Sequence, residues 1–269
     1  MCIMIRVYVE NIQDTIMLNA KQMHYLKNVM RCQDGQIIEI FDNQNEWRAK
    51  ISFPHIHAIE QKNIEQKLAT IQRRPKIGMG YIRKSRLEWA IEKATELGVD
   101  EIYLLMTDRV NHKYIDLRRL ERIAIEAAEQ CGRIGVPKIH ENIKLSNLPE
   151  LNWVVAAKEE SSDKNAKYYE SQDNQINNAQ IKSQDTQINS QSDSLIQSNL
   201  VEIIENNRTH IEQSNSIDFW NGDGILIGPE GGWSENDLSL LQKYNKVQLH
   251  DNVLRTETAV CAALTLFRP

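Results

Sequence analysis

Residues 1 to about 70 contain short runs in which apolar and polar positions alternate, the pattern typical of half-buried strands. The runs are "MIRVYVE", "QIIEIF", "EWRAKI" and "HIHAIE", and the turn "DNQN" separates the second from the third. One amphipathic helix interrupts them, because Asn19 can cap "AKQMHYLKNVM" and Met23, Leu26 and Met30 fall on one face. The pattern predicts a small β-rich domain, with residues 1–72 as its bounds.

Strands and helices alternate in the rest of the chain, which we predict to be a second domain over residues 73–269. The candidate strands are "KIGMGYI", "VDEIYLLM", "VPKI", "WVVAA", "GILIG" and "KVQL". Ser85 and Glu88 form a capping-box pattern for a helix that Gly98 would end, Asp116 can cap a second, and "ETAVCAALTLF" is a third. This alternation predicts an α/β fold with a mostly parallel sheet, helices on both faces, and ligands beyond the carboxyl ends of the strands.

A segment of different composition, residues 159–216, interrupts the second domain. It is rich in Ser, Gln, Asn and Asp and contains an imperfect repeat, "SQDNQIN" and "SQDTQIN". Such a segment buries too little apolar surface to offset its ordering entropy, so we predict a disordered insertion with no part in the chemistry. It carries ten acidic and four basic residues, which leaves 27 acidic and 28 basic residues elsewhere. The formal net charge of −5 therefore comes from the insertion, and the rest of the chain permits an RNA partner.

Composition argues against several classes of protein. Hydrophobic residues make up 41% of the chain, but no run of about eighteen apolar residues occurs, and the N-terminus lacks the pattern of a signal peptide. We therefore expect a soluble cytoplasmic protein without membrane contact. The cysteines form no C-x-x-C pair, and His55 and His57 have no neighbouring ligand cluster, so no metal site is expected.

The bend "GPEGG" at residues 228–232 follows a run of branched apolar residues and precedes a helix that Ser234 and Asp237 can start as a capping box. Glycines permit positive φ and close approach of the backbone to a ligand, while Pro229 narrows the shapes available to the bend. The bend matches neither the G-x-x-x-x-G-K-[ST] phosphate loop nor the G-x-G-x-x-G dinucleotide motif. We interpret it as a ligand-binding bend of another kind, and an ordinary strand-to-helix turn is the alternative.

Two charged stretches are further candidates. In "LHDNVLRTETA", Thr256 or Thr258 could cap the last helix, and Arg255 is the one cation. The simplest role for Arg255 is a salt bridge to Glu257 or Glu230.

The second charged stretch, "IRKSRLEWAIEKATELG", places several cations where the opening strand of the second domain ends: Arg83, Lys84, Arg86 and Lys93. A helix N-terminus usually favours acidic residues, so these cations indicate an anionic partner, with an ordinary mixed surface as the alternative.

Five stretches in order resemble the RsmE family of 16S ribosomal RNA uracil-N3 methyltransferases, which belongs to the SPOUT superfamily: "HYLKNVMR", "SRLEWAIEKATELGVDEI", "EAAEQCGR", "ILIGPEGGWSENDL" and "LRTETAV". The resemblance covers nearly the whole chain apart from the insertion. It implies a PUA-like RNA-binding domain followed by a SPOUT-type parallel sheet with a C-terminal trefoil knot. It also implies S-adenosyl-L-methionine as cofactor, a homodimer, and 16S rRNA within the small ribosomal subunit as substrate.

The resemblance implies that two turns of the chain hold the cofactor, mainly through backbone groups. Carried onto this chain, these residues are Leu226, Gly228, Pro229, Glu230, Gly231, Gly232, Leu249, His250, Val253, Leu254 and Thr256. The chain departs from the family at His250 and Asn252, where the family usually has glycine and arginine. If that glycine requires a positive φ, His250 must adopt it at some energetic cost.

Uracil N3 carries a proton, so its methylation needs either a base or stabilisation of the uracil anion. We expect Arg255 to stabilise negative charge on the uracil carbonyls, with Glu230 as a weaker candidate for the base. RNA contact is expected from cations of both domains: Lys27, Arg31, Lys84, Arg86 and Arg133. Two alternatives are a non-catalytic RNA-binding or ribosome assembly factor and a SPOUT methyltransferase that acts on another RNA.

Overall fold

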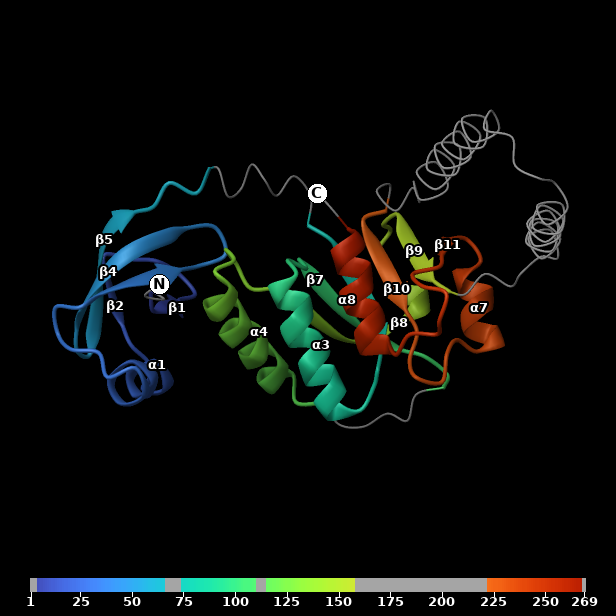
Figure 1. The fold of residues 1–269 in the computed structure, drawn as a ribbon, viewed down its shortest axis with the longest axis horizontal. Helices are drawn as coiled ribbons and strands as arrows, with labels where there is room; N and C mark the ends of the chain where they lie inside the picture. The colour runs from blue at the N-terminus through green and yellow to red at the C-terminus, as the bar shows by residue number, and fades with distance from the viewer. Residues whose placement is uncertain (1–3, 66–73, 110–114, 158–221, 268–269) are drawn as a thin grey trace, which may run out of the picture.

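The computed structural model of the protein describes residues 4–65, 74–109, 115–157 and 222–267. The chain forms two β-sheets, one from residues 6–61 and one from residues 76–247 (Figure 1). The predicted insertion at 159–216 lies outside the described residues, as does most of the predicted connection between the domains.

The first sheet has five strands in the order β1-β3-β4-β5-β2. They are β1 (Arg6–Tyr8), β2 (Thr15–Met17), β3 (Ile37–Phe41), β4 (Glu46–Ser52) and β5 (His55–Gln61). β1 pairs with β3 in parallel, and the other pairings are antiparallel. The four predicted strands are confirmed. The sequence pattern does not reveal β2, because this three-residue edge strand has two exposed side chains.

One helical segment packs on this sheet, as predicted. α1 (Ala20–His24) continues into a π-helical turn, η1 (Tyr25–Val29). The Asn19 side chain accepts two backbone N–H groups of the first turn, so the predicted cap is confirmed. Leu26 is fully buried, whereas Met30 is 40% exposed, so the predicted apolar stripe faces the core only in part.

The second sheet has six strands in the order β11-β9-β10-β6-β7-β8, and all its pairings are parallel. They are β6 (Lys76–Gly80), β7 (Glu101–Met106), β8 (Lys138–Lys144), β9 (Trp153–Ala156), β10 (Gly224–Ile227) and β11 (Asn245–Val247). The predicted α/β class with a parallel sheet is confirmed. The strand order reverses between β6 and β10, and ligands of open parallel sheets bind beyond the carboxyl ends of strands at such a switch point.

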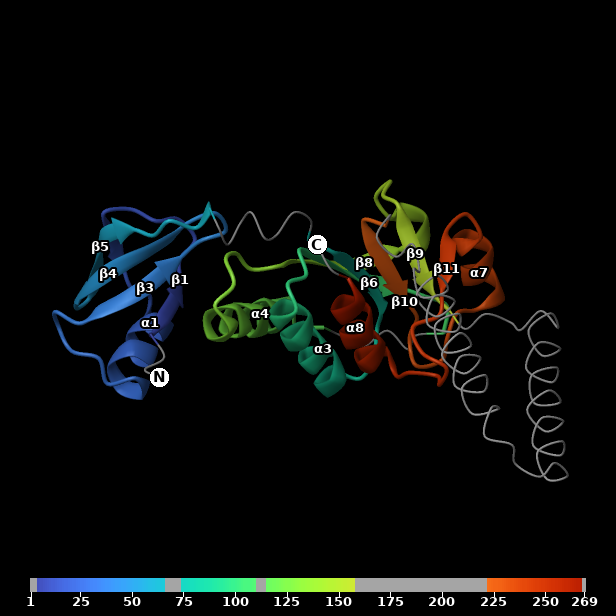
Figure 2. The ribbon, with the colours of Figure 1, turned by 45° about the horizontal axis from the view of Figure 1, so that its top comes forward.

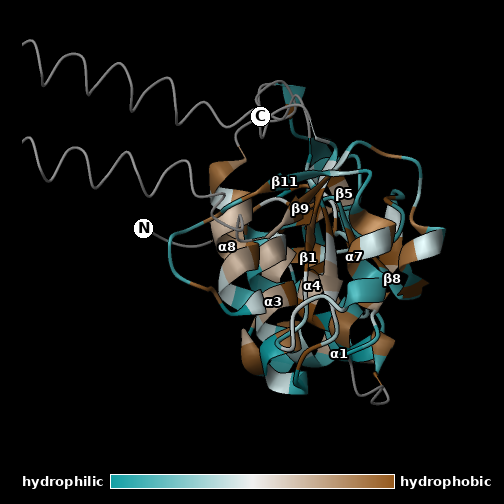
Figure 3. Cartoon of the chain, turned by 90° about the vertical axis from the view of Figure 1, so that its right-hand side faces the viewer, coloured by the Kyte–Doolittle hydropathy of each residue, from teal (hydrophilic) through white to brown (hydrophobic). Residues whose placement is uncertain are grey.

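Helices cover both faces of this sheet (Figure 2). One face packs against α3 (Lys84–Glu96), α4 (Leu117–Cys131) and α8 (Thr256–Leu266), and the other against α7 (Glu235–Leu241) and the short 3₁₀ turn η2 (Leu145–Asn147). Alternate strand residues therefore enter two cores, which explains the continuous apolar runs. Figure 3 shows brown, hydrophobic strands in the interior. The trefoil knot stays a prediction, because the path from β9 to β10 lies outside the described residues.

The helix ends confirm most of the predicted capping signals and correct one. Asp116 caps α4, and Gly98 and Gly132 follow their helices with φ of 89° and 79°. The predicted Ser85–Glu88 capping box is wrong, because α3 begins at Lys84 after Arg83, which makes no side-chain cap bond.

Glu88 has a stronger partner than the helix backbone. Its carboxylate accepts two bonds from the Arg119 guanidinium of α4, at 2.5 and 2.8 Å between nitrogen and oxygen. A two-point, charge-assisted bond of this kind outcompetes a capping bond to a neutral N–H. Among the helices of the described ranges, none has the length and apolar character needed to cross a bilayer.

The small domain docks on the C-terminal end of α4 through Arg6 of β1. The Arg6 guanidinium donates to the carbonyls of Ala128 and Arg133, at nitrogen–oxygen distances of 3.0 and 3.2 Å. Carbonyls at a helix C-terminus carry partial negative charge, so a cation is favourable there. Because Glu46, which is fully buried, lies 3.4 Å from the same guanidinium, the buried charge of Arg6 is compensated.

A shielded carboxylate lies in the same junction. Glu129 of α4 accepts the backbone N–H of Tyr8 at 2.9 Å between nitrogen and Oε1. Burial raises the pKa of Glu129 from 4.5 to about 7, with a smaller contribution in the same direction from Glu126. Folding therefore takes up a proton at Glu129 between these two pH values.

We expect Glu129→Gln to remove this pH dependence. The stability due to the protonated carboxyl is fully present below the unfolded pKa of 4.5 and is lost as pH rises through the folded pKa of about 7. Gln keeps an acceptor for the Tyr8 N–H and cannot ionise. Between pH 4.5 and pH 8 the wild type should lose roughly 1–3 kcal/mol more unfolding free energy than the variant.

Urea unfolding at the two pH values measures this difference. Glu121→Gln, an exposed change on the same helix, is the control and should follow the wild type. Equal losses in the wild type and Glu129→Gln would contradict the expectation.

Candidate functional site

The glycine bend, residues 228–232, lies at the carboxyl end of β10, at the switch point of the sheet. The N–H of Gly232 donates to the carbonyl of Pro229 at 2.8 Å, and Gly232 has a φ of 67°, a conformation that favours glycine. Ser234 and Asp237 then form the predicted capping box at the start of α7, with bonds of 2.9 and 3.0 Å. Both ends of the bend are therefore defined by regular structure.

β6 approaches the bend so closely that a side chain does not fit between them. A Cβ on Gly80 would lie 2.6 Å from the backbone nitrogen of Pro229. Two residues earlier on β6, a Cβ on Gly78 would lie 2.5 Å from the Leu226 side chain. The two glycines of "GMG" thus allow the backbones of β6 and the bend to pack directly against each other.

The loop before α8 closes the bend from another side. The hydroxyl of Thr256 donates to the carbonyl of Gly228 at 2.8 Å, and Thr256 is only 3% exposed. The structure therefore brings together the two turns that the sequence resemblance assigned to the cofactor. Neither Thr256 nor Thr258 caps α8 as predicted: the N-cap is Arg255, and it makes no side-chain cap bond.

The carboxylates near the bend pair with Arg86 rather than with Arg255. Arg86, in the first turn of α3, forms an ion pair with Glu230 of the bend and lies 3.6 Å from Glu257 of α8. Arg255 is exposed and forms no ion pair within the described part of the chain. The carboxylates expected to pair with Arg255 thus pair with Arg86, which is far from them in the sequence.

The loop after β7 also braces the bend, and sequence reasoning missed it. The Arg109 guanidinium donates to the carbonyl of Gly231 at 2.9 Å. The carboxylate of Asp108 accepts the hydroxyl of Ser234 at 2.8 Å and the amide of Asn236 at 3.1 Å. The sequence carries one indication of this role: "TDR" directly follows a buried strand, at the same edge of the sheet as the bend. β7 is also the neighbour of β6.

The segment from Leu249 to Leu254 has two kinds of residue. Leu249 and Leu254 pack against the main core, whereas Val253 is 83% exposed. The ring nitrogen Nδ1 of His250 accepts the N–H of Asn252 at 3.0 Å. Within the described residues the non-glycine positions with positive φ do not include His250, so the expected backbone cost at this departure from the family does not arise.

Buried polar atoms without a partner lie beside the bend. The hydroxyl of Thr107, the ring N–H of Trp233 and one carboxylate oxygen of Glu257 are buried and have no hydrogen-bond partner in the described part of the protein. The Trp233 ring packs against Gly228, where an added Cβ would lie 3.2 Å from it. Buried polar groups are normally paired, so unpaired ones next to a glycine bend are what a polar ligand site requires.

The predicted RNA contacts differ in their surroundings. Lys27, Arg31 and Lys84 are exposed. Arg86 is engaged by carboxylates, and Arg133 is half-buried at the domain junction, where its Nη1 donates to a backbone carbonyl at 2.9 Å. Burial lowers the pKa of Arg133 to about 10. The Thr95 carbonyl already accepts from this guanidinium, so less of the charge of Arg133 is free for a partner in solvent than that of the three exposed cations, and its RNA role stays a prediction.

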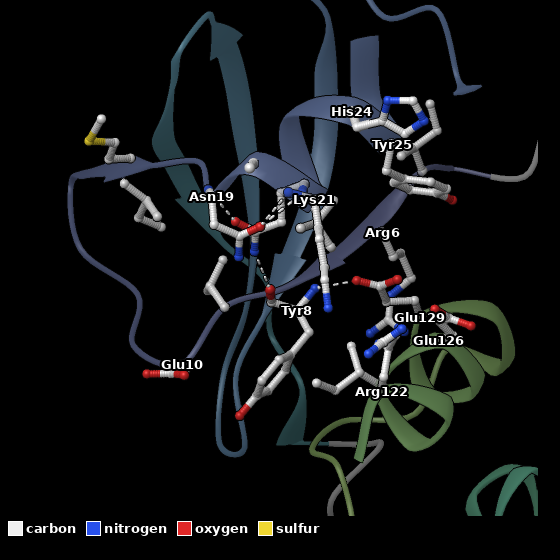
Figure 4. A pocket seen from close by; sticks show the side chains of 18 of the residues that line it. Arg6, Tyr8, Glu10, Asn19, Lys21, His24, Tyr25, Arg122, Glu126 and Glu129 are labelled. Atoms are coloured by element: carbon white, nitrogen blue, oxygen red, sulfur yellow. Dashed lines mark hydrogen bonds between the residues drawn. The ribbon is translucent and has the colours of Figure 1, made fainter. Parts of the chain in front are cut away.

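A wide groove of about 1650 Å³ lies between the small domain and α4. Figure 4 shows Arg122, Glu126 and Glu129 of α4 facing Tyr8 and Lys21 across it. Cations and carboxylates are mixed along its walls, and none of the predicted site residues lines it. The groove is therefore separate from the glycine bend.

Fold and site together define an α/β protein that presents backbone polar groups at the switch point of a parallel sheet and carries a small β domain. Solved structures with this architecture include a ribosomal RNA small subunit methyltransferase E from Neisseria gonorrhoeae bound to S-adenosyl methionine, with a TM-score of 0.67, 19% identity, and 97% and 95% of the two chains covered. A Legionella pneumophila methyltransferase with bound cofactor has a TM-score of 0.66 at 19% identity over 98% of this chain and 97% of that one.

The RNA methyltransferase domain family matches residues 71–196 and 175–268, and the chain belongs to this family. The RNA methyltransferase PUA domain matches residues 18–59. Ribosomal RNA small subunit methyltransferase E of Rickettsia conorii is 26% identical over 91% of this chain and 86% of its own length. The Bacillus subtilis protein of the same name is also 26% identical, over 93% and 88%. The resemblance to the RsmE family is thus confirmed.

We expect Gly80→Ala to destabilise the protein by roughly 1–3 kcal/mol, because the added methyl overpacks the contact with the Pro229 backbone. Gly231→Ala is a matched control in the bend itself, since its Cβ would meet the Arg109 side chain at an ordinary 3.4 Å. Denaturant unfolding of both variants measures the difference. Equal stability of the two variants would show that the β6 contact is not tight.

Proposed function

We propose that the protein transfers a methyl group from S-adenosyl-L-methionine to N3 of a uridine in the 16S rRNA of the small ribosomal subunit. The Thr256–Gly228 hydrogen bond carries the proposal, because it joins the two turns to which the resemblance assigns the cofactor. The relatives named ribosomal RNA small subunit methyltransferase E support the rRNA substrate. The two solved structures with a bound cofactor support S-adenosyl-L-methionine.

The residues at the bend fit this cofactor. Backbone N–H and carbonyl groups of residues 228–232, together with Leu226 and the segment from Leu249 to Thr256, would hold it. The unpaired Thr107 hydroxyl and Trp233 ring N–H are additional buried donors for a polar ligand. When bound, the cofactor supplies an electrophilic methyl group on a sulfonium. Because the sheet holds the backbone groups in place, little ordering entropy is lost on binding.

Arg255 is the stronger candidate for stabilising the uracil anion. It is exposed, and it stands at the N-cap of α8, where the helix backbone also contributes partial positive charge. A cation and a helix N-terminus that face the same substrate oxygen would both favour the anion formed when N3 loses its proton. Glu230 is the weaker candidate for the base, because Arg86 already pairs with its carboxylate.

The two domains have separate tasks in this proposal. Residues 1–72 contribute RNA-binding cations, Lys27 and Arg31, and residues 73–269 hold the cofactor and contribute Lys84. Cations that neutralise phosphates supply most of the sequence-independent affinity for RNA. The proposal includes a homodimer, which the resemblance implies, and a cytoplasmic location, which agrees with a substrate inside the small ribosomal subunit.

Mapping of methylated uridines tests the activity. 16S rRNA from cells lacking the protein should lack one N3-methyluridine, and purified protein with S-adenosyl-L-methionine should restore it on the isolated small subunits. Methyl transfer to a different RNA instead would show that 16S rRNA is not the substrate. Binding to small subunits without any methyl transfer would support a non-catalytic assembly factor instead.

We expect Arg255→Ala to reduce methyl transfer to small subunits by tenfold or more while the Kd for S-adenosyl-L-methionine stays within about twofold, because the cation acts on the uracil rather than on the cofactor. Arg48→Ala, a change of an exposed arginine on β4 of the small sheet, is the control. Single-turnover rates and calorimetry give the two quantities. Unchanged transfer in Arg255→Ala would exclude Arg255 from the reaction.

A further inference from the structure

Arg86 stands where an unpaired cation is unfavourable. It lies in the first turn of α3. This turn contains no acidic residue, and the N-cap residue before it, Arg83, makes no side-chain capping bond. The N-terminal end of a helix carries partial positive charge, so a cation there raises the free energy unless a carboxylate compensates it. A compensating partner must therefore come from another part of the chain.

Two carboxylates from different elements supply that compensation. Nη1 of Arg86 forms an ion pair with Glu230 in the glycine bend, and Nε lies 3.6 Å from Oε1 of Glu257 in the first turn of α8. The Glu257 side chain is only 13% exposed, and its other oxygen is buried without a partner. Arg86 is thus the cation that balances Glu257 among the described residues.

The guanidinium joins three segments with one side chain. Its nitrogens point in fixed directions in one plane, so it can bridge two carboxylates on separate segments and hold their spacing, which the single ammonium of lysine does less well. The bridged segments are the bend and the start of α8, the two turns that the Thr256 hydroxyl also joins. The Arg86 bridge and the Thr256 bond therefore restrain the same spacing.

We propose that Arg86 is a positioning residue of the methyl-donor site: it holds the glycine bend against the first turn of α8, and its charge is not available to RNA. This inference rests on the proposed function and changes the role that the sequence suggested for Arg86. Lys84, which lies two residues earlier in the same turn of α3 and is exposed, keeps the RNA role.

Paired measurements on Arg86→Gln and Lys84→Gln test the proposal. Arg86→Gln should raise the Kd for S-adenosyl-L-methionine by roughly tenfold. The variant removes the bridge between the bend and α8, and it leaves Glu257 buried without its cation, so the two turns no longer keep their spacing. The same variant should leave the salt dependence of small-subunit rRNA affinity unchanged. Lys84→Gln should show the reverse: the same Kd for the cofactor, and a slope of log affinity against log salt that is shallower by about 0.7–0.9.

A double-mutant cycle separates positioning from a general loss of structure. If Arg86 acts through Glu230, then Glu230→Gln should cost much less cofactor affinity in the Arg86→Gln background than in the wild type. Arg86→Lys, which keeps the charge and loses the fork of donors, should bind the cofactor with intermediate affinity.

Each contrary outcome has a distinct meaning. If the wild type binds the cofactor and Arg86→Gln binds it equally well, the positioning role is wrong and the proposed function stands. A shallower salt slope in Arg86→Gln, like that of Lys84→Gln, would return Arg86 to RNA contact. Additive effects in the double-mutant cycle would also overturn the proposal. No cofactor binding by the wild type would overturn the proposed function together with it.

Discussion

The hydrogen bond from the Thr256 hydroxyl to the Gly228 carbonyl is the contact on which the candidate site depends. It fixes the start of α8 to a bend that already rests on β6, where Gly80 leaves no room for a side chain. The bend is thus held by backbone contacts on one side and by a buried hydroxyl on the other. A site built from such backbone groups is ordered before any ligand arrives, so binding has less conformational entropy to overcome.

Around this contact, the three nearby arginines have different surroundings. Arg109 donates to the carbonyl of Gly231, and Arg86 bridges the carboxylates of Glu230 and Glu257. Both therefore act on the shape of the bend. Arg255 is exposed and free of carboxylates within the described ranges, which leaves its charge available to a substrate. A positive group that is already neutralised stabilises a developing anion poorly, so this separation of roles favours Arg255 over Arg86 and Arg109 for the proposed stabilisation of the uracil anion.

The second organising contact joins the two domains. Arg6 of the small domain donates to carbonyls at the C-terminal end of α4, and the loop after α4 returns a bond from the N–H of Gly135 to the carbonyl of Asp42 at 3.2 Å. One set of bonds joins a cation of the small domain to the end of α4, and the other joins the backbones of the two domains. The proposed RNA-binding cations of the small domain are therefore held in a defined position relative to α3 and the glycine bend.

By itself the sequence determined the strands other than β2, the helix starts at Asp116 and Ser234, and the parallel α/β class, because alternation, capping and glycine stops act between residues close in the chain. It also indicated the glycine bend, whose composition carries its own conformational signal. Only the tertiary structure decided that Arg86 pairs with Glu230, that the Thr256 hydroxyl goes to the bend and that Arg133 is half-buried. Such partners lie far apart in the chain, and which of them meet depends on which strands are neighbours in the sheet.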